Sequence, residues 1–208
     1  MPQTETGPST EAAFWSRGAP MRRLDRTTSL LLIVDIQERL APHVAGHEAL
    51  IARTQALLSA AARLGVPRLA TEHCGQQIGP LVSAITAVLE PREIFPKTRF
   101  GAMDHREFQA LLARTARTQI VVAGMEAHVC VMQTALGLLA AHYDVFVVGD
   151  AVGSRAERQA DRQFALTRLR DAGCTIAGTE TVLFEWTGSG DDAAFGDILK
   201  LVKALPAA

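Results

Sequence analysis

The chain has 208 residues, of which 48% are hydrophobic, and a formal net charge of -1. This length suits a single domain with a sizeable core, and the mixed charges exclude the basic surface of proteins that bind nucleic acid or acidic membranes. No apolar run reaches the ~18 residues of a membrane span, and the N-terminal stretch lacks the apolar middle of a signal peptide. We therefore expect a cytoplasmic protein whose partner is a small molecule.

The three cysteines, Cys74, Cys130 and Cys174, are odd in number and have no CxxC spacing. This pattern excludes a disulfide framework or a zinc ribbon and favours a reducing compartment.

Residues 1–28 are rich in proline and small polar residues and have no helical or strand periodicity. They predict a flexible N-terminal tail ahead of one domain at 29–208. Phe14 and Trp15 could dock this tail on a neighbour, the alternative being a mobile extension. Either Met1 or Met21 is the true start of the protein.

From residue 30 onward, short apolar runs alternate with amphipathic stretches. The runs predict strands at 30–34, 67–71, 93–95, 119–124, 144–149 and 174–177. The stretches predict helices at 47–64, 80–89, 104–114, 129–141 and 158–171, then a short segment at 181–186 and a last helix at 191–205. Continuous apolar strands are typical of a parallel sheet covered on both faces. The sequence therefore predicts an α/β fold, a three-layer sandwich around a central, mostly parallel six-stranded sheet.

Reactive side chains follow the predicted strands. Asp35 follows the first strand and Lys97 the third, and Cys130 lies at the turn between the fourth strand and the next helix; His73, Cys74 and Asp150 also follow strands. Since ligands bind beyond the carboxyl ends of parallel strands, we expect these residues to lie near one site. A carboxylate can take the proton of a thiol, a lysine can stabilise negative charge, and a backbone turn can bind an oxyanion. The helix N-terminus is expected to lower the pKa of Cys130 from about 8.5 into the range 3.5 to 7.5.

Each of these residues also has a structural interpretation. Asp35 could end a strand and cap a turn, Lys97 could be a solvated surface lysine, and Cys130 could be a small buried hydrophobic residue. The joint occurrence of an acid, a cation and a thiol at strand ends favours the catalytic interpretation.

Three segments carry a resemblance to a known family: LLLIVDIQ at 30–37, FPKTRFGA at 95–102, and IVVAGMEAHVCVMQTALGLLAAHYDVFVVGDAVGSR at 120–155. From residue 30 to about 203 the chain resembles the isochorismatase-like cysteine hydrolases, which include nicotinamidases and N-carbamoyl amidases. EAHVCVMQTAL and DRQFALTRLRDAGC are most similar to the isochorismatase-domain-containing subgroup, whose substrates are mostly unknown. The resemblance implies that Asp35, Lys97 and Cys130 are catalytic. It also implies a cis peptide bond between Met125 and Glu126, with the backbone N–H groups of Glu126 and Cys130 as oxyanion-hole donors.

The chain departs from the nicotinamidases after the second strand. They carry an Asp-x-His metal motif there, whereas this chain reads TEHCG at 71–75. We therefore expect no metal and no cofactor. A metal site built from Glu72, His73, Cys74 or His105 is the alternative, although adjacent residues of an extended segment point apart.

Four residues are candidates for substrate binding: Gln37, His73, Cys74 and Phe100. Cys74 is also a rival nucleophile, but its glycine-rich loop shows no helix N-terminus. Phe100 could equally belong to the core.

Three other residues receive structural predictions. Glu126 either caps the following helix or selects a substrate amine, with the structural role favoured. For His128 we expect a structural hydrogen bond, and Cys174 is expected in the core.

The sequence therefore predicts a metal-independent cysteine hydrolase that cleaves a C–N bond of a small amide or carbamoyl compound through a Cys130 thioester. The alternatives are a non-hydrolytic thiol or redox enzyme that uses Cys130 or Cys74, and a pseudoenzyme with a binding or assembly role. Isochorismate hydrolysis is a weaker option, because that branch of the family works without the nucleophilic cysteine. Relatives are commonly oligomers, so we expect a homodimer or a homotetramer.

Overall fold

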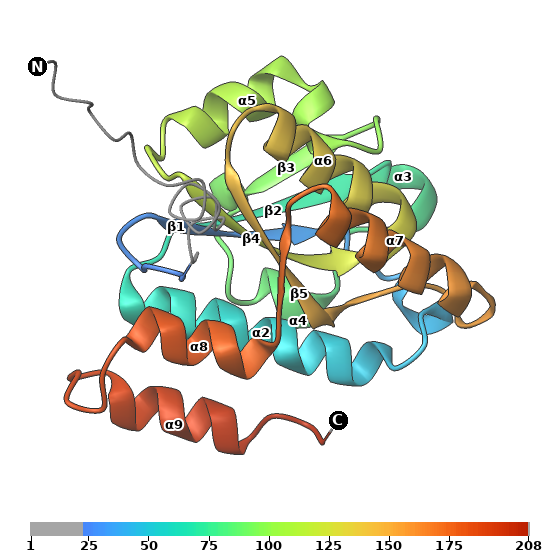
Figure 1. Ribbon diagram of the computed structural model, residues 1–208. Helices are drawn as coiled ribbons and strands as arrows, with labels where there is room; N and C mark the ends of the chain where they lie inside the picture. The colour runs from blue at the N-terminus through green and yellow to red at the C-terminus, as the bar shows by residue number, and fades with distance from the viewer. Residues whose placement is uncertain (1–22, 208) are drawn as a thin grey trace, which may run out of the picture.

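The computed structural model describes residues 23–207 (Figure 1). Residues 1–22 of the predicted tail lie outside the described residues, and so do Phe14, Trp15 and both candidate start methionines. The described part begins with residues that contact the domain. Leu24 is buried, and the Gln119 side chain bonds the backbone of Arg23 and Asp25.

Six parallel strands form one sheet in the order β3-β2-β1-β4-β5-β6. Their bounds are β1 Ser29–Val34, β2 Arg68–His73, β3 Ile94–Lys97, β4 Gln119–Met125, β5 Asp144–Gly153 and β6 Thr175–Ala177. The predicted α/β sandwich and its six strands are confirmed, and every strand pair is parallel.

Helices cover both faces of the sheet (Figure 1). The α-helices are α2 His47–Leu64, α3 Gly75–Ile78, α4 Ser83–Thr86, α5 Arg106–Ala113, α6 Met132–Ala140, α7 Gln159–Asp171, α8 Thr179–Thr187 and α9 Phe195–Lys203. Short 3-10 turns lie at η1 Ala41–His43, η2 Pro91–Glu93, η3 Ala102–Asp104 and η5 Ala156–Arg158, and η4 Ala127–Val131 is a π-helix. None of the helices in the described part is long and apolar enough to cross a membrane.

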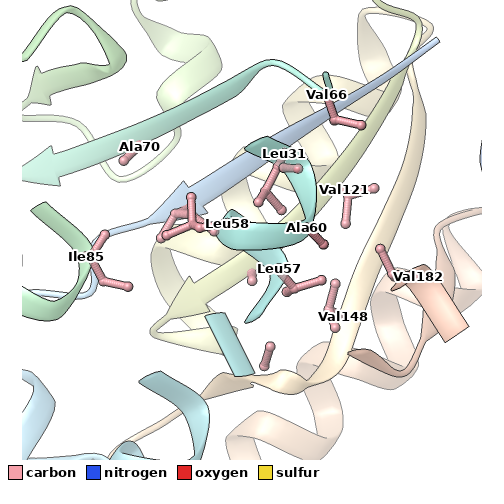
Figure 2. Close-up of a cluster of buried hydrophobic side chains, with 14 of the residues drawn as sticks. Leu31, Leu57, Leu58, Ala60, Val66, Ala70, Ile85, Val121, Val148 and Val182 are labelled. Atoms are coloured by element: carbon pink, nitrogen blue, oxygen red, sulfur yellow. The ribbon is translucent and has the colours of Figure 1, made fainter. Parts of the chain in front are cut away.

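Alternate residues of the central strands supply the two hydrophobic cores. In β1, Leu31 and Ile33 pack in the core beneath α2, α8 and α9, whereas Leu30 and Leu32 pack in the core beneath α5, α6 and α7. Figure 2 shows the first core, where Leu57 of α2 lies close to residues from neighbouring strands. Because successive strand residues point to opposite faces, a continuously apolar strand is what a sheet covered on both sides requires.

Two predicted elements differ from the structure. The predicted helix at 80–89 is limited to the four residues of α4, because Leu81 forms an isolated bridge with Gln37 and its N–H donates to the Glu72 carboxylate. β5 continues four residues beyond the predicted end, because Val152 and Gly153 pair with the end of β4 after an irregularity in register. As a result Asp150 lies within β5 instead of following it.

Gly124 allows the closest approach between β1 and β4. Its φ is +137°, and a Cβ atom there would lie 2.0 Å from the carbonyl oxygen of Val34. Only glycine fits this position, which lies beside the turn where Asp35 leaves β1.

Candidate active site

Asp35 lies at the carboxyl end of β1 with its carboxylate buried. The residue has a φ of 52° and is 1% exposed. Thr71 Oγ1 donates a hydrogen bond of 2.7 Å to Oδ1, and Lys97 Nζ donates one of 2.7 Å to Oδ2. The register of the sheet explains this placement, since Val34 pairs with Thr71 and His73 with Lys97 across neighbouring strands.

Lys97 ends β3, and its ammonium group is enclosed by acceptors. Besides Asp35, Nζ donates to the backbone oxygens of Arg99 at 3.3 Å and Phe100 at 3.0 Å. An ammonium group has three N–H donors, so all of them are used. The side chain is 0% exposed. The alternative of a solvated surface lysine is therefore wrong.

Cys130 belongs to η4, the π-helix that follows β4, and is 7% exposed. Its thiol lies close enough to the Asp35 carboxylate and the Lys97 ammonium group for both charges to act on its pKa. The structure thus brings together the acid, the cation and the thiol that the sequence placed at three strand ends.

The pKa of the Cys130 thiol is raised, contrary to the expectation from the helix N-terminus. Burial is the main cause, the negative charge of Asp35 adds to it, and the positive charge of Lys97 opposes it. The free energy needed to remove a thiolate from water exceeds the stabilisation that the helix N-terminus and Lys97 give it, because Lys97 is already paired with Asp35. The resting site therefore holds a neutral thiol beside an ion pair.

The turn before Cys130 contains a cis peptide bond between Met125 and Glu126, as the resemblance implied. Within residues 23–207 the Glu126 N–H donates to no protein acceptor. The Glu126 side chain makes no cap hydrogen bond, so the helix-cap interpretation is wrong. Its carboxylate instead accepts from the backbone N–H and Nε of Arg155, at 3.2 and 2.8 Å.

His128 lies in the same turn and forms a structural contact. Its Nδ1 is 2.9 Å from Oγ of the buried Ser154. The structural hydrogen bond expected for His128 is confirmed. Ser154 and Arg155, the two residues that follow β5, thus bind both polar side chains of the turn.

Both polar atoms of the Gln37 side chain are bonded to the backbone around the site. Its side chain is fully buried, donates to the backbone oxygens of His73 and Gly79, and accepts from the His73 N–H at 2.8 Å. These bonds join the loop after β1 to the end of β2. The prediction that Gln37 binds substrate is therefore wrong, because its amide is consumed by the backbone around the site.

His73 and Phe100 lie beside the Asp35–Lys97 pair. Their rings are 5.2 Å apart, and Phe100, whose carbonyl binds Lys97, is 49% exposed. Burial and the charge of Lys97 lower the pKa of His73, which keeps its imidazole neutral at neutral pH. Its Nδ1 is buried and has no hydrogen-bond partner within the described residues. The core alternative for Phe100 is wrong, since half of this residue faces solvent.

Cys74 lines a pocket of about 410 Å³, together with the neighbouring residues Glu72, Pro96, Lys97, Thr98 and His105. It has a φ of 43° and immediately precedes α3, so a short helix does begin after it, contrary to expectation. Cys174 is buried in the second core, as expected. In the part of the chain that the structure covers, no group of three or more His, Cys, Asp or Glu residues is placed to hold a metal ion.

Thr71 is a site residue that the sequence analysis missed. It holds the second oxygen of the Asp35 carboxylate, yet in the sequence it is only the last residue of a predicted strand. The available signal was the register of a parallel sheet, which places the end of β2 beside the end of β1.

Replacing Thr71 with valine is expected to lower the free energy of unfolding by about 1.5 to 3 kcal/mol, because a buried carboxylate oxygen loses its donor. Thr71→Ser keeps the hydroxyl and is the matched control, with an expected loss of about 0.8 kcal/mol for one methyl group. Urea unfolding measures both values. Equal losses in the two variants would contradict this role for the hydroxyl.

Sequence matches to curated relatives extend over most of this chain. It is 32% identical over 177 residues to isochorismatase domain-containing protein 1 of Salmo salar, a match that covers 85% of this chain but only 62% of that protein. It is 33% identical over 196 residues to the secreted isochorismatase effector Isc1 of Phytophthora sojae, which covers 92% of each chain.

Solved structures show the same fold. The MAR1 ribonuclease of Caenorhabditis elegans superposes with a TM-score of 0.83 at 31% identity, over 89% of this chain and 95% of that one. The YcaC gene product of Escherichia coli, described as an octameric hydrolase of unknown specificity, gives 0.82 at 26% identity, over 88% and 92%. The isochorismatase domain family matches residues 29–181. With this match over most of its length, the chain belongs to the isochorismatase family of hydrolase-fold proteins.

Proposed function

We propose that this protein is a metal-independent cysteine hydrolase that cleaves a C–N bond of a small amide or carbamoyl compound through a thioester on Cys130. The observation that carries the proposal is the buried cluster of Asp35, Lys97 and Cys130. A buried ion pair contributes little net stability, because the desolvation of both charges offsets their attraction. Placing one against a thiol is better explained by catalysis than by folding.

In the proposed acylation step, Asp35 accepts the Cys130 proton while Sγ attacks the substrate carbonyl carbon. The raised pKa keeps the thiol protonated until a substrate arrives. Proton transfer neutralises Asp35, so the charge that opposed the thiolate disappears and Lys97 is left facing the sulfur. The net charge of the cluster does not change. The N–H groups of Glu126 and Cys130 are the proposed donors to the oxyanion.

In the following steps the C–N bond breaks, and Asp35 returns its proton to the leaving nitrogen. Ammonia or an amine departs and leaves an acyl group on Sγ. Water then attacks the thioester, Asp35 accepts a proton from this water, and the C–S bond breaks. The sulfur recovers the proton, and a carboxylic or carbamic acid is released.

His73, Phe100 and Cys74 are the proposed contacts for the substrate. The half-exposed Phe100 ring, tilted against the neutral imidazole of His73, would give the substrate an apolar wall. This lining suits an uncharged amide better than a charged substrate.

A cytoplasmic location and a homodimeric or homotetrameric assembly complete the proposal. The cysteines within residues 23–207 form no disulfide bonds, which suits a reducing compartment. Assembly is supported by the relative described as an octamer. One relative is described as a secreted effector, so fractionation of the native cells is the test of location.

Ammonia release from a panel of small primary amides and carbamoyl compounds tests the reaction class. We expect turnover of at least one compound, with the same rate before and after incubation with EDTA. No release from any member would favour the pseudoenzyme alternative. Activity that EDTA removes and zinc restores would contradict metal-independent hydrolysis.

A further inference from the structure

A second pocket of about 410 Å³ lies apart from Asp35, Lys97 and Cys130. Residues before and within the first two turns of α2 line one side, and residues of β5 and α7 line the others. Gly46, Ala49, Arg53, Asp150, Gln159 and Arg162 are among them. Figure 1 shows α2 and α7 beginning at the same side of the molecule. The pocket therefore lies between two helix N-termini.

Arg53 is a largely buried lining residue, with 9% of its surface exposed. Its Nε lies 3.3 Å from Asp150 Oδ2, and its Nη2 donates to the backbone oxygens of Pro206 and Ala207. Its Nη1 has no protein acceptor within residues 23–207.

Arg162 reaches the same pocket from α7 and forms no ion pair with any described carboxylate. Its Nε donates to the Val152 oxygen at 3.0 Å and its Nη2 to the Gly149 oxygen, while Nη1 has no acceptor in the described chain. Burial lowers the pKa of this guanidinium, and Asp150 is the acid that opposes the shift.

Among the described residues that line the pocket, positive charge therefore exceeds negative charge. Among the described lining residues, Asp150 carries the one carboxylate; it pairs with Arg53 and also accepts from the N–H and hydroxyl of Thr179. The other acids on the flanking helix turns do not line the pocket, since Glu48 is exposed and Asp161 lies beside Arg158. Arg162 is partly buried and has no carboxylate partner among the described residues, so an anion in the pocket would offset the cost of its desolvation.

The N-terminus of α2 also favours an anion in this pocket. The 18-residue helix α2 begins after Gly46, which provides no side-chain cap. The positive end of the helix dipole thus meets the pocket at Gly46 and Ala49. Leu50 and Val152 supply an apolar wall.

We propose that this pocket binds a small oxyanion, a carboxylate or a phosphate group, through the Nη1 groups of Arg53 and Arg162. The pairing of guanidinium donors with two oxygens is the geometry that both groups favour. The apolar wall accommodates a short alkyl substituent on the anion.

Thermal unfolding of the full chain tests the proposal, with sodium phosphate and sodium butyrate titrated against sodium chloride at equal ionic strength. At several times the dissociation constant, the preferred anion should raise the melting temperature by about 2 to 4 °C in a saturable way. The anion whose titration gives a saturable rise in melting temperature, phosphate or butyrate, identifies the group that the pocket binds. Arg162→Gln should abolish the rise. Arg158→Gln removes the same charge from the turn before α7, at a site that does not line the pocket, and should leave the rise intact.

A second variant keeps the proposal testable if Arg162→Gln does not fold. Ala49→Glu places a carboxylate in the pocket, and should raise the melting temperature without added anion and remove the response to added anion. The proposal is overturned if neither anion gives a saturable rise, if Arg162→Gln responds like the wild type, or if Ala49→Glu keeps the full response.

Discussion

Asp35→Asn is expected to slow turnover by about 10²- to 10⁴-fold while it makes Cys130 react faster with iodoacetamide at pH 7. The first effect follows from the loss of the group proposed to move the proton. The second follows because the charge of Asp35 raises the pKa of the Cys130 thiol, so its removal increases the thiolate fraction. Ammonia release gives the first rate, and mass spectrometry of the Cys130 peptide gives the second.

Glu38→Gln is the control for this experiment. It removes one negative charge three residues away, from an exposed side chain, and should change neither rate. Circular dichroism should show that Asp35→Asn is folded, since asparagine can still bond Thr71 or Lys97. Slower alkylation in Asp35→Asn would contradict the role of Asp35 in holding the thiol protonated.

Cys130→Ala is expected to reduce turnover by at least about 10⁴-fold, because without the sulfur no acyl group can be carried by the protein. The fold should survive, since alanine fills most of the space of a cysteine in this well-packed position. Cys74→Ala is the matched variant that tests the rival nucleophile. It should keep kcat, with any change confined to KM, because the Asp35 carboxylate acts on the Cys130 thiol, whereas Cys74 lies in the loop before α3 and only borders the pocket that Lys97 also lines.

Serine at position 130 separates the chemistry from the packing. Cys130→Ser preserves the size of the side chain but replaces the thiol with a much weaker acid, so turnover should fall nearly as far as in the alanine variant. Full activity in Cys130→Ala, or loss of activity in Cys74→Ala alone, would show that Cys130 is not the nucleophile.

The layout of the fold was predictable because its strands are uninterrupted apolar runs. β1 reads SLLLIV with every residue buried, and such a segment fits only between two helical layers. The segment at 80–89 was predicted incorrectly because its conformation is set by remote partners. Pro80 and Val82 bond the backbone of Glu38 and Ile36, which holds the chain extended before α4.

The positions of the candidate catalytic residues were also predictable, because parallel strands bring their carboxyl ends to one edge. What the sequence could not supply is the balance of burial and charge at that edge. The helix N-terminus next to Cys130 is a local feature and predicted a lowered pKa. The thiol's burial and its contact with Asp35 depend on the tertiary structure, and they raise it instead. Gln37 was misassigned for the same reason, since its partners lie 36 and 42 residues away.

A rapid-quench single-turnover experiment with excess enzyme and a compound that the amide panel identifies tests the central claim most directly. Intact mass and peptide mapping would follow the protein, while the acid product is measured in parallel. The account predicts a transient adduct with the mass of the acyl group on the Cys130 peptide, formed before the acid product and absent from Cys130→Ala. Acid product that forms with no adduct at any time, or an adduct on Cys74, would contradict it.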